Sequence, residues 1–173
     1  MEIAQEFLVL GTALLPFFEA RGAIPLGMLV FNLSAKKVLF WGILGNILVV
    51  PVVYFLLSIL NSFFPKIFLW IWKFTQKRTK KINVLNLASL SLFVAIPLPF
   101  TGVWTGTALA FFLKIPFWIA FFSISFGAIM SALLVLFLTN LGIFLNQNFG
   151  IQGILSLVLF LIVIFTFLKK NEK

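Results

Sequence analysis

The sequence predicts an all-α integral membrane protein with a single domain. Of its 173 residues, 62% are hydrophobic and 10% are charged, and the mean hydropathy is +1.19, whereas a soluble domain carries about 25% charged residues. Polar or basic segments separate long apolar runs, and proline and glycine motifs break two of these runs near their middle. These observations favour a bundle of continuous and interrupted membrane helices.

The first unit, residues 1–60, contains a broken run followed by a spanning helix. The motif PFFEARGAIPLG interrupts the run Ile3–Leu33 and leaves two pieces, each much shorter than the ~20 residues that a spanning helix needs. After the link SAKK, the run Val38–Leu60 is long enough to span. The N-terminus lacks a basic region and a small-residue cleavage site, so we expect no signal peptide.

A basic, tryptophan-rich segment follows at residues 61–83. It places lysines on one helical face and apolar residues on the other, and its tryptophans suit the headgroup boundary. We expect an amphipathic helix in the cytoplasmic interface, with membrane lipids as partners. Its basic side chains, which bind anionic headgroups, are Lys66, Lys73, Lys77, Arg78, Lys80 and Lys81.

The second unit, residues 84–141, has the same order of elements as the first. The motif PLPFTG breaks the run Val84–Leu113, KIP forms the link, and Phe117–Leu141 is the second spanning candidate. A short polar link then leads to a C-terminal transmembrane helix over residues 153–168 and a basic tail.

Lysine and arginine mark the cytoplasmic side of a membrane protein, so their distribution decides how the broken runs are placed. If the runs are kinked spans, the basic residues other than Arg21 divide six against six. If they are re-entrant hairpins, these residues divide ten against two. We therefore predict re-entrant hairpins in a multi-pass protein of the cytoplasmic (plasma) membrane, with the N-terminus outside and the C-terminus in the cytoplasm.

The two units then form an inverted repeat, because the first ends on the face opposite to its start. Gly22 and Gly102 are 80 residues apart, and the links before Val38 and Phe117 match to within one or two residues. Inverted repeats with helices interrupted at corresponding positions indicate a transport site near the midplane. Chance similarity between two apolar segments is the alternative that we weigh against this repeat.

The first hairpin tip carries two charges inside an apolar run. Glu19 is the only acidic residue away from the termini, and Arg21 follows it, with Gly22 and Pro25 breaking the helix. In one hypothesis, Glu19 carries protons and Arg21 attracts an anion, assisted by the half-helix N-terminus near Ala23. In the other, the two side chains pair, or Arg21 binds backbone, and they only hold the tip together.

The second tip is polar but uncharged. Its hydroxyl groups could contact substrate or satisfy backbone groups that the break frees. Asn46 of the first span is a costly polar group in lipid, so we expect it to face the hairpins. The candidate residues of this tip are Pro97, Pro99, Thr101, Gly102, Trp104 and Thr105.

The composition excludes several classes of function. The chain has no histidine and no cysteine, which removes disulfides, Cys or His catalysis and the usual ligands of zinc and copper. Without a nucleophile–base or metal constellation, we expect no enzyme activity, no metal and no cofactor. The net charge of +9 suits anionic lipid better than nucleic acid in so apolar a chain.

Three motifs, FEARGAIPLG, GNILVVP and VAIPLPFTGVWTGTALAF, resemble the signatures of the small multidrug export protein family over about Leu15 to Leu141. That family is similar to the wider DedA/VTT membrane proteins, which include proposed lipid scramblases and flippases with two opposed re-entrant hairpins. Phe100 stands where the family pattern has glycine, and the second hairpin lacks the basic residues of DedA relatives. The resemblance implies a transporter-like fold and carries over Glu19, Arg21, Gly22, Pro25, Pro97, Pro99, Gly102, Trp104 and Gly106.

We therefore expect a membrane transporter or small-molecule exporter, coupled to protons, with a midplane site between the two tips. A DedA-like phospholipid flippase or scramblase is the first alternative, and a non-transporting membrane scaffold is the second. The expected partners are membrane lipids and a small-molecule or lipid substrate. A short chain with few spans is also compatible with a homodimer.

Overall fold

A computed structural model of the protein describes residues 2–66, 68, 69, 71, 86–97 and 101–171, with the backbone alone at residues 86, 87 and 149 and from residue 151 onward. All elements formed by these residues are helices, which confirms the predicted all-α class. The chain divides into two compact units, Met1–Leu136 and Phe137–Lys173. Most of the predicted interfacial helix, including Lys73, Lys77, Arg78, Lys80 and Lys81, lies outside the described residues, as does Pro99.

Within the part of the chain that the structure describes, two helices are long and apolar enough to cross a membrane by length and composition. They are α3 (Ala35–Phe63) and, within α7 (Phe117–Asn171), the part Phe117–Asn148. With 29 residues, α3 is about 44 Å long, more than the ~30 Å of a hydrocarbon core. Only 28% of the most apolar 18-residue stretch of α3 is buried. Such a helix has the length and the exposed apolar surface that suit a position in lipid.

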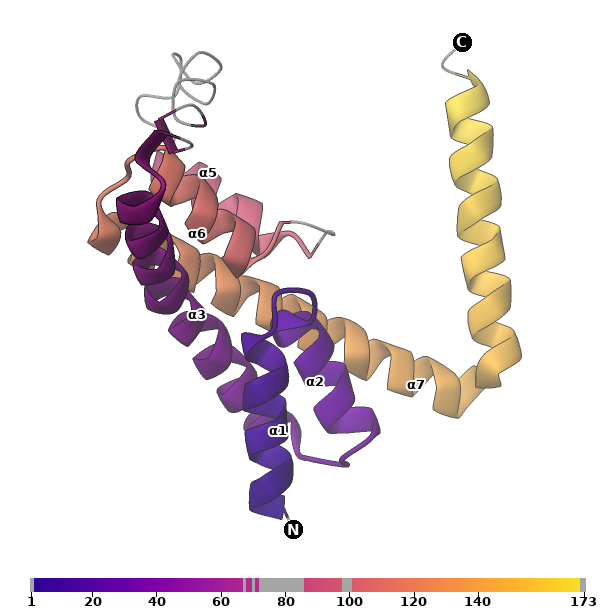
Figure 1. Ribbon diagram of the computed structural model, residues 1–173. Helices are drawn as coiled ribbons and strands as arrows, with labels where there is room; N and C mark the ends of the chain where they lie inside the picture. The colour runs from indigo at the N-terminus through magenta and orange to yellow at the C-terminus, as the bar shows by residue number, and fades with distance from the viewer. Residues whose placement is uncertain (1, 67, 70, 72–85, 98–100, 172–173) are drawn as a thin grey trace. The chain divides into compact units, whose positions relative to one another are not determined.

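The first unit begins with two short helices, α1 (Glu2–Leu14) and α2 (Glu19–Leu29). Their 13 and 11 residues reach only about 20 and 16 Å, too short to span a bilayer alone. They pack against each other and against α3, and Figure 1 shows them antiparallel, with the N-terminus and the α2–α3 link at one end. We call this pair hairpin one and residues 15–18 its turn.

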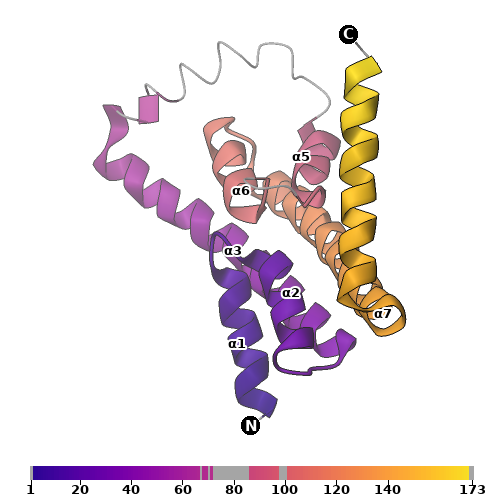
Figure 2. The same cartoon turned by 90° about the vertical axis from the view of Figure 1, so that its right-hand side faces the viewer.

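A second short pair, α5 (Asn86–Ala95) and α6 (Val103–Phe112), forms hairpin two. The two helices contact each other, and α6 packs against α3, as Figure 2 also shows. Valines of α3 fill a core with the buried side chains of this hairpin and of the first part of α7. The fully buried members include Val49, Val50, Val94, Val103, Ala110, Ala120 and Ile124.

Glycines in both long helices let the first arm of each hairpin approach closely. A Cβ atom at Gly45 in α3 would lie 2.6 Å from the Cβ of Ala13 in α1. A Cβ atom at Gly127 in α7 would lie 2.5 Å from the carbonyl oxygen of Ser91 in α5. Real Cβ atoms do not come so near, so these contacts require glycine. The glycine next to Asn46 therefore serves close helix packing, as its sequence context allows.

The sequence predicts a polar link after residue 141, and within that segment the structure has a kink at Gly150 between two helical stretches of α7. The helix α7 continues through this segment, and its single non-helical residue is Gly150, with φ 64° and ψ −178°. The amide of Asn148 donates to the carbonyl of Phe144 at 2.8 Å, so this polar side chain is accommodated on the helix surface. Polarity alone does not end the helix at residue 141, and the kink falls at a glycine, for which a left-handed φ costs little.

Candidate functional site

The candidate site lies where the turn of hairpin one meets the facing ends of α5 and α6. Glu19, the first residue of α2, has a φ of 48°, a left-handed conformation that residues other than glycine rarely adopt. The next N–H group, that of Ala20, donates to Oδ1 of Asn46 at 3.0 Å. Asn46 is buried within α3, so one polar side chain of the long helix holds the turn of hairpin one.

The carboxylate of Glu19 caps the N-terminus of α6. It is buried and accepts hydrogen bonds from the backbone N–H groups of Val103 and Trp104, the latter at 3.4 Å. Gly102, the residue before α6, makes this approach possible, because a Cβ atom there would overlap both carboxylate oxygens. A helix N-terminus carries a partial positive charge and unbonded N–H groups. The negative charge of hairpin one therefore complements the dipole of α6 in hairpin two.

Arg21 makes the opposite contact, with the C-terminal end of α5. Its Nη2 atom donates to the carbonyl oxygens of Val94 and Ile96, each at 3.3 Å, and to that of Thr101 at 2.8 Å. Carbonyl groups in the last turn of a helix lack helical partners and carry partial negative charge. Glu19 and Arg21 of hairpin one thus both bind backbone groups of hairpin two.

The two charged side chains also lie near each other, with Nε of Arg21 3.9 Å from Oε2 of Glu19. This separation is at the limit of an ion pair and longer than the contacts that Arg21 makes with hairpin two. Both side chains are shielded from solvent, with exposed fractions of 20% for Arg21 and 6% for Glu19. The hydrogen bond from Arg21 to Thr101 in hairpin two, at 2.8 Å, is shorter than the 3.9 Å separation between Arg21 and Glu19.

Polar side chains of hairpin two bind backbone carbonyls around the break. The indole Nε1 of Trp104 donates to Leu14 at the end of α1, at 3.1 Å. The hydroxyl of Thr101 donates to Ile96 at 2.7 Å, and that of Thr105 to Gly102 at 3.1 Å. Both hydroxyls therefore satisfy backbone oxygens, one of the two uses that the sequence allows for them.

The remaining candidates lie around this contact. The N–H of Gly22 donates to Phe18 at 2.8 Å, while Pro25 lies further along α2 and Pro97 follows α5. The sequence predicts an anion-binding helix N-terminus near Ala23. The N–H of Ala20 donates to Asn46 instead, so one of the N–H groups at that helix end is already hydrogen-bonded to a side chain of the protein.

A cluster at the other end of hairpin one was not predicted. Nζ of Lys37, in the first turn of α3, lies 2.9 Å from Glu2 and 2.8 Å from Glu6. Nε1 of Trp41 donates to Glu6 at 2.9 Å. The signal was present as two pairs at helical i,i+4 spacing, Glu2 with Glu6 and Lys37 with Trp41.

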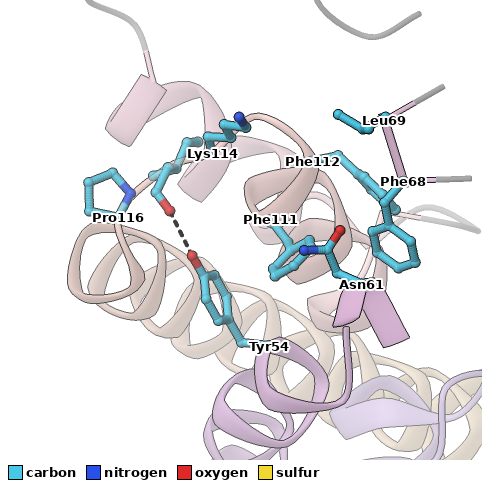
Figure 3. Close-up of a pocket in the computed structure, with 9 residues that line it drawn as sticks. Tyr54, Asn61, Phe68, Leu69, Phe111, Phe112, Lys114 and Pro116 are labelled. Carbon is cyan, nitrogen blue, oxygen red and sulfur yellow. Dashed lines mark hydrogen bonds between the residues drawn. The ribbon is translucent and has the colours of Figure 1, made fainter. Parts of the chain in front are cut away.

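A cavity of about 350 Å³ lies away from the two tips, between the C-terminal half of α3, the end of α6 and the α6–α7 link (Figure 3). The sequence did not indicate it, although it contains the only tyrosine of the chain. Its lining residues are Tyr54, Asn61, Phe68, Leu69, Phe111, Phe112, Lys114, Ile115 and Pro116.

Comparison with known proteins identifies the family. The family model described as "Putative small multi-drug export protein" matches residues 19–134, about two thirds of the chain. The match begins at Glu19 and covers the long helix α3 and all of hairpin two. No curated protein and no solved structure matches the chain. The resemblance that the motifs indicate is thus confirmed, and the chain belongs to the small multi-drug export protein family.

Proposed function

We propose that the protein is a proton-coupled transporter that moves small molecules out of the cell between its two hairpin tips. The family description supports export of small molecules. The observation that carries the coupling is the buried carboxylate of Glu19 against the N-terminus of α6. A charged carboxylate inside a membrane is costly and commonly belongs to a proton pathway. Because this carboxylate holds the two tips together, binding of a proton to it changes how readily the tips separate.

A proton on Glu19 changes what the carboxyl group can do at the end of α6. The ionised form accepts charge-assisted hydrogen bonds from Val103 and Trp104, and such bonds are about twice as strong as neutral ones. The protonated form loses the attraction to the helix dipole and turns one acceptor into a donor. Protonation therefore loosens the contact between the tips, and loss of the proton closes it again. The hydrogen bonds of Arg21 to the end of α5 stay intact, so the two hairpins remain connected there while the contact at Glu19 opens.

Three corresponding pairs of residues support an inverted repeat, which gives the transporter its alternating access. Asn32 and Lys114 both have left-handed backbones, with φ 54° and 56°, and each lies three residues before a long helix. Ala35 and Phe117 start those helices, and Gly45 and Gly127 receive the first arms of the hairpins. Each pair is 82 residues apart.

In this arrangement both hairpins re-enter the membrane from opposite faces while α3 and the first part of α7 cross it. The bias of basic residues supports an external N-terminus and a cytoplasmic C-terminus. The tips then meet inside the bilayer, where broken backbone is tolerated because hairpin two and α3 satisfy its polar groups.

The test uses purified protein in liposomes that contain a pH-sensitive dye, with a panel of fluorescent organic cations and anions as probes. An imposed pH gradient should drive probe movement with a matching proton flux. Glu19→Gln should abolish the gradient-driven movement, since glutamine cannot exchange a proton. Glu2→Gln is the matched control, because Glu2 is an exposed acid at the far end of α1, and its flux should equal that of the wild type.

Undiminished gradient-driven flux in Glu19→Gln would remove this residue from the mechanism. Movement of labelled phospholipid without any gradient, sensitive to Arg21→Ala, would favour a DedA-like flippase or scramblase. Absence of both activities in the folded wild-type protein would favour a membrane scaffold.

A further inference from the structure

We infer that the cavity beside Tyr54 binds an amphipathic anion, with its apolar body among the phenylalanine rings and its negative charge at Lys114. The cavity of about 350 Å³ lies within the range of about 300 to 1,000 Å³ that is usual for small-molecule sites. It lies apart from the contact between Glu19 and Gly102 and is not needed for the proposed proton coupling. The site is therefore additional to the transport path.

Aromatic rings form the apolar wall of this cavity. The ring centroids of Tyr54 and Phe111 are 5.2 Å apart, and those of Phe68 and Phe112 are 5.4 Å apart. A third contact, 6.0 Å between Phe68 and Phe111, joins the two pairs. Rings packed in this way present broad apolar surface with little loss of side-chain entropy on binding. The wall suits the apolar or aromatic part of a ligand.

The α6–α7 link holds the polar edge of the cavity in a defined shape. The hydroxyl of Tyr54 donates to the carbonyl of Ile115 at 3.1 Å, and the N–H of Lys114 donates to Phe111 at 3.0 Å. Lys114 itself has a left-handed backbone with φ 56°. Figure 3 shows the side chain of Lys114 on this link, whereas the amide of Asn61 lies between the rings of Phe111 and Phe68.

The charge of the lining selects the sign of the ligand. Lys114 is the one charged residue among the nine described residues that line the cavity, and none of these nine is acidic. An organic cation would be repelled there, and a small inorganic anion would leave the ring surface unfilled. An anion with an apolar body satisfies both parts of the cavity. Asn61 and Ser62 lie in the last turn of the apolar helix α3. With α3 spanning the bilayer as proposed, the site is level with the lipid headgroups, where such molecules concentrate.

Two sources can supply this chemistry, an anionic phospholipid of the adjacent leaflet or a free amphipathic organic anion. We would place a photo-crosslinking benzoylphenylalanine at Phe112 in nanodiscs of equimolar phosphatidylglycerol and phosphatidylcholine, and identify the adducts by mass spectrometry. The same label at Asn61, a second lining residue, gives an independent measurement in case the substitution at Phe112 changes the shape of the cavity. The same label at Phe40, which is 61% exposed on α3, reports the bulk lipid ratio.

We expect phosphatidylglycerol adducts to be enriched several-fold over the bulk ratio at Phe112 and Asn61 but not at Phe40. In nanodiscs of phosphatidylcholine alone, added anilinonaphthalene sulfonate tests the free anion by the same adducts. Lys114→Gln should remove the enrichment of whichever anion binds. Lys36→Gln, the matched change at the other end of α3, should leave it intact. Bulk ratios at both labels together with no sulfonate adduct, or enrichment unchanged by Lys114→Gln, would overturn the inference.

Discussion

The carboxylate of Glu19 occupies the space in which a side chain at residue 102 would begin, so Gly102 is the residue that lets the two hairpins meet. This contact joins a charge on one hairpin to the backbone of the other. The tips are therefore held together by interactions that depend on the charge of one carboxyl group and on the absence of one methyl group.

Gly102→Ala should destabilise the protein, because the new Cβ atom displaces the buried carboxylate of Glu19. Overpacking of this kind costs about 1–3 kcal/mol in the free energy of unfolding. Thermal unfolding in detergent micelles measures the change. Gly11→Ala in α1 is the control, because nothing lies within 4 Å of its added Cβ, and a helical Gly→Ala change gains about 0.5–1 kcal/mol.

A double-mutant cycle makes the cause specific. In a Glu19→Ala background the overlap is gone, so Gly102→Ala should cost much less than it does in the wild type. Equal costs in both backgrounds would show that the contact between Glu19 and Gly102 is not the reason for the loss.

Arg21→Lys should weaken the end of hairpin two although it keeps the positive charge. A lysine ammonium has a different reach and geometry and cannot serve all three carbonyl oxygens that Nη2 of Arg21 contacts. Hydrogen bonds to charged groups contribute about 1.5–3 kcal/mol each, so we expect a loss of that order. Hydrogen exchange should accelerate in α5 and α6, and more strongly in Arg21→Gln. Unchanged exchange in both variants would contradict this role.

Asn46→Leu should destabilise hairpin one, because it leaves the N–H of Ala20 without its partner in a buried position. An unsatisfied buried donor costs about 1–3 kcal/mol, measured by thermal unfolding. Asn148→Leu is the control, since that amide is exposed and bonds only within its own helix. Similar losses for the two substitutions would exclude the bond to Ala20 as the cause.

Labelling from one side of the membrane should distinguish hairpins from kinked spans. The chain has no native cysteine, so Glu2→Cys, Ser34→Cys and Ser62→Cys each introduce a single thiol. Hairpin one places residues 2 and 34 on one side and residue 62 on the other, in agreement with the contact between Glu2 and Lys37 at 2.9 Å. The measurement is which of the three thiols an impermeant maleimide labels when it is added outside oriented vesicles. Opposite sides for residues 2 and 34 would establish a kinked span.

Much of the fold follows from local sequence signals. Long apolar runs predict α3 and the first part of α7, because the transfer of each side chain into lipid depends on its own chemistry. Proline and glycine mark both interruptions, since their effects on the backbone are local. The polar segment after residue 141 predicts a break between two helical stretches, which lies at Gly150, but not its exact position, because polarity alone does not determine where a helix ends.

The sequence by itself determined that this is a helical membrane protein of the small multi-drug export family. It also singled out Glu19 and Arg21, because charges inside apolar runs are costly enough to be conspicuous. Only the tertiary structure decided that Glu19 caps α6, that Arg21 binds the end of α5 and that rings from distant segments enclose a cavity. The partners of both charges are backbone N–H and C=O groups, which nearly every residue carries. No sequence motif distinguishes these backbone groups from others, and only the packing of the two hairpins decides which of them lie within hydrogen-bonding distance of Glu19 and Arg21.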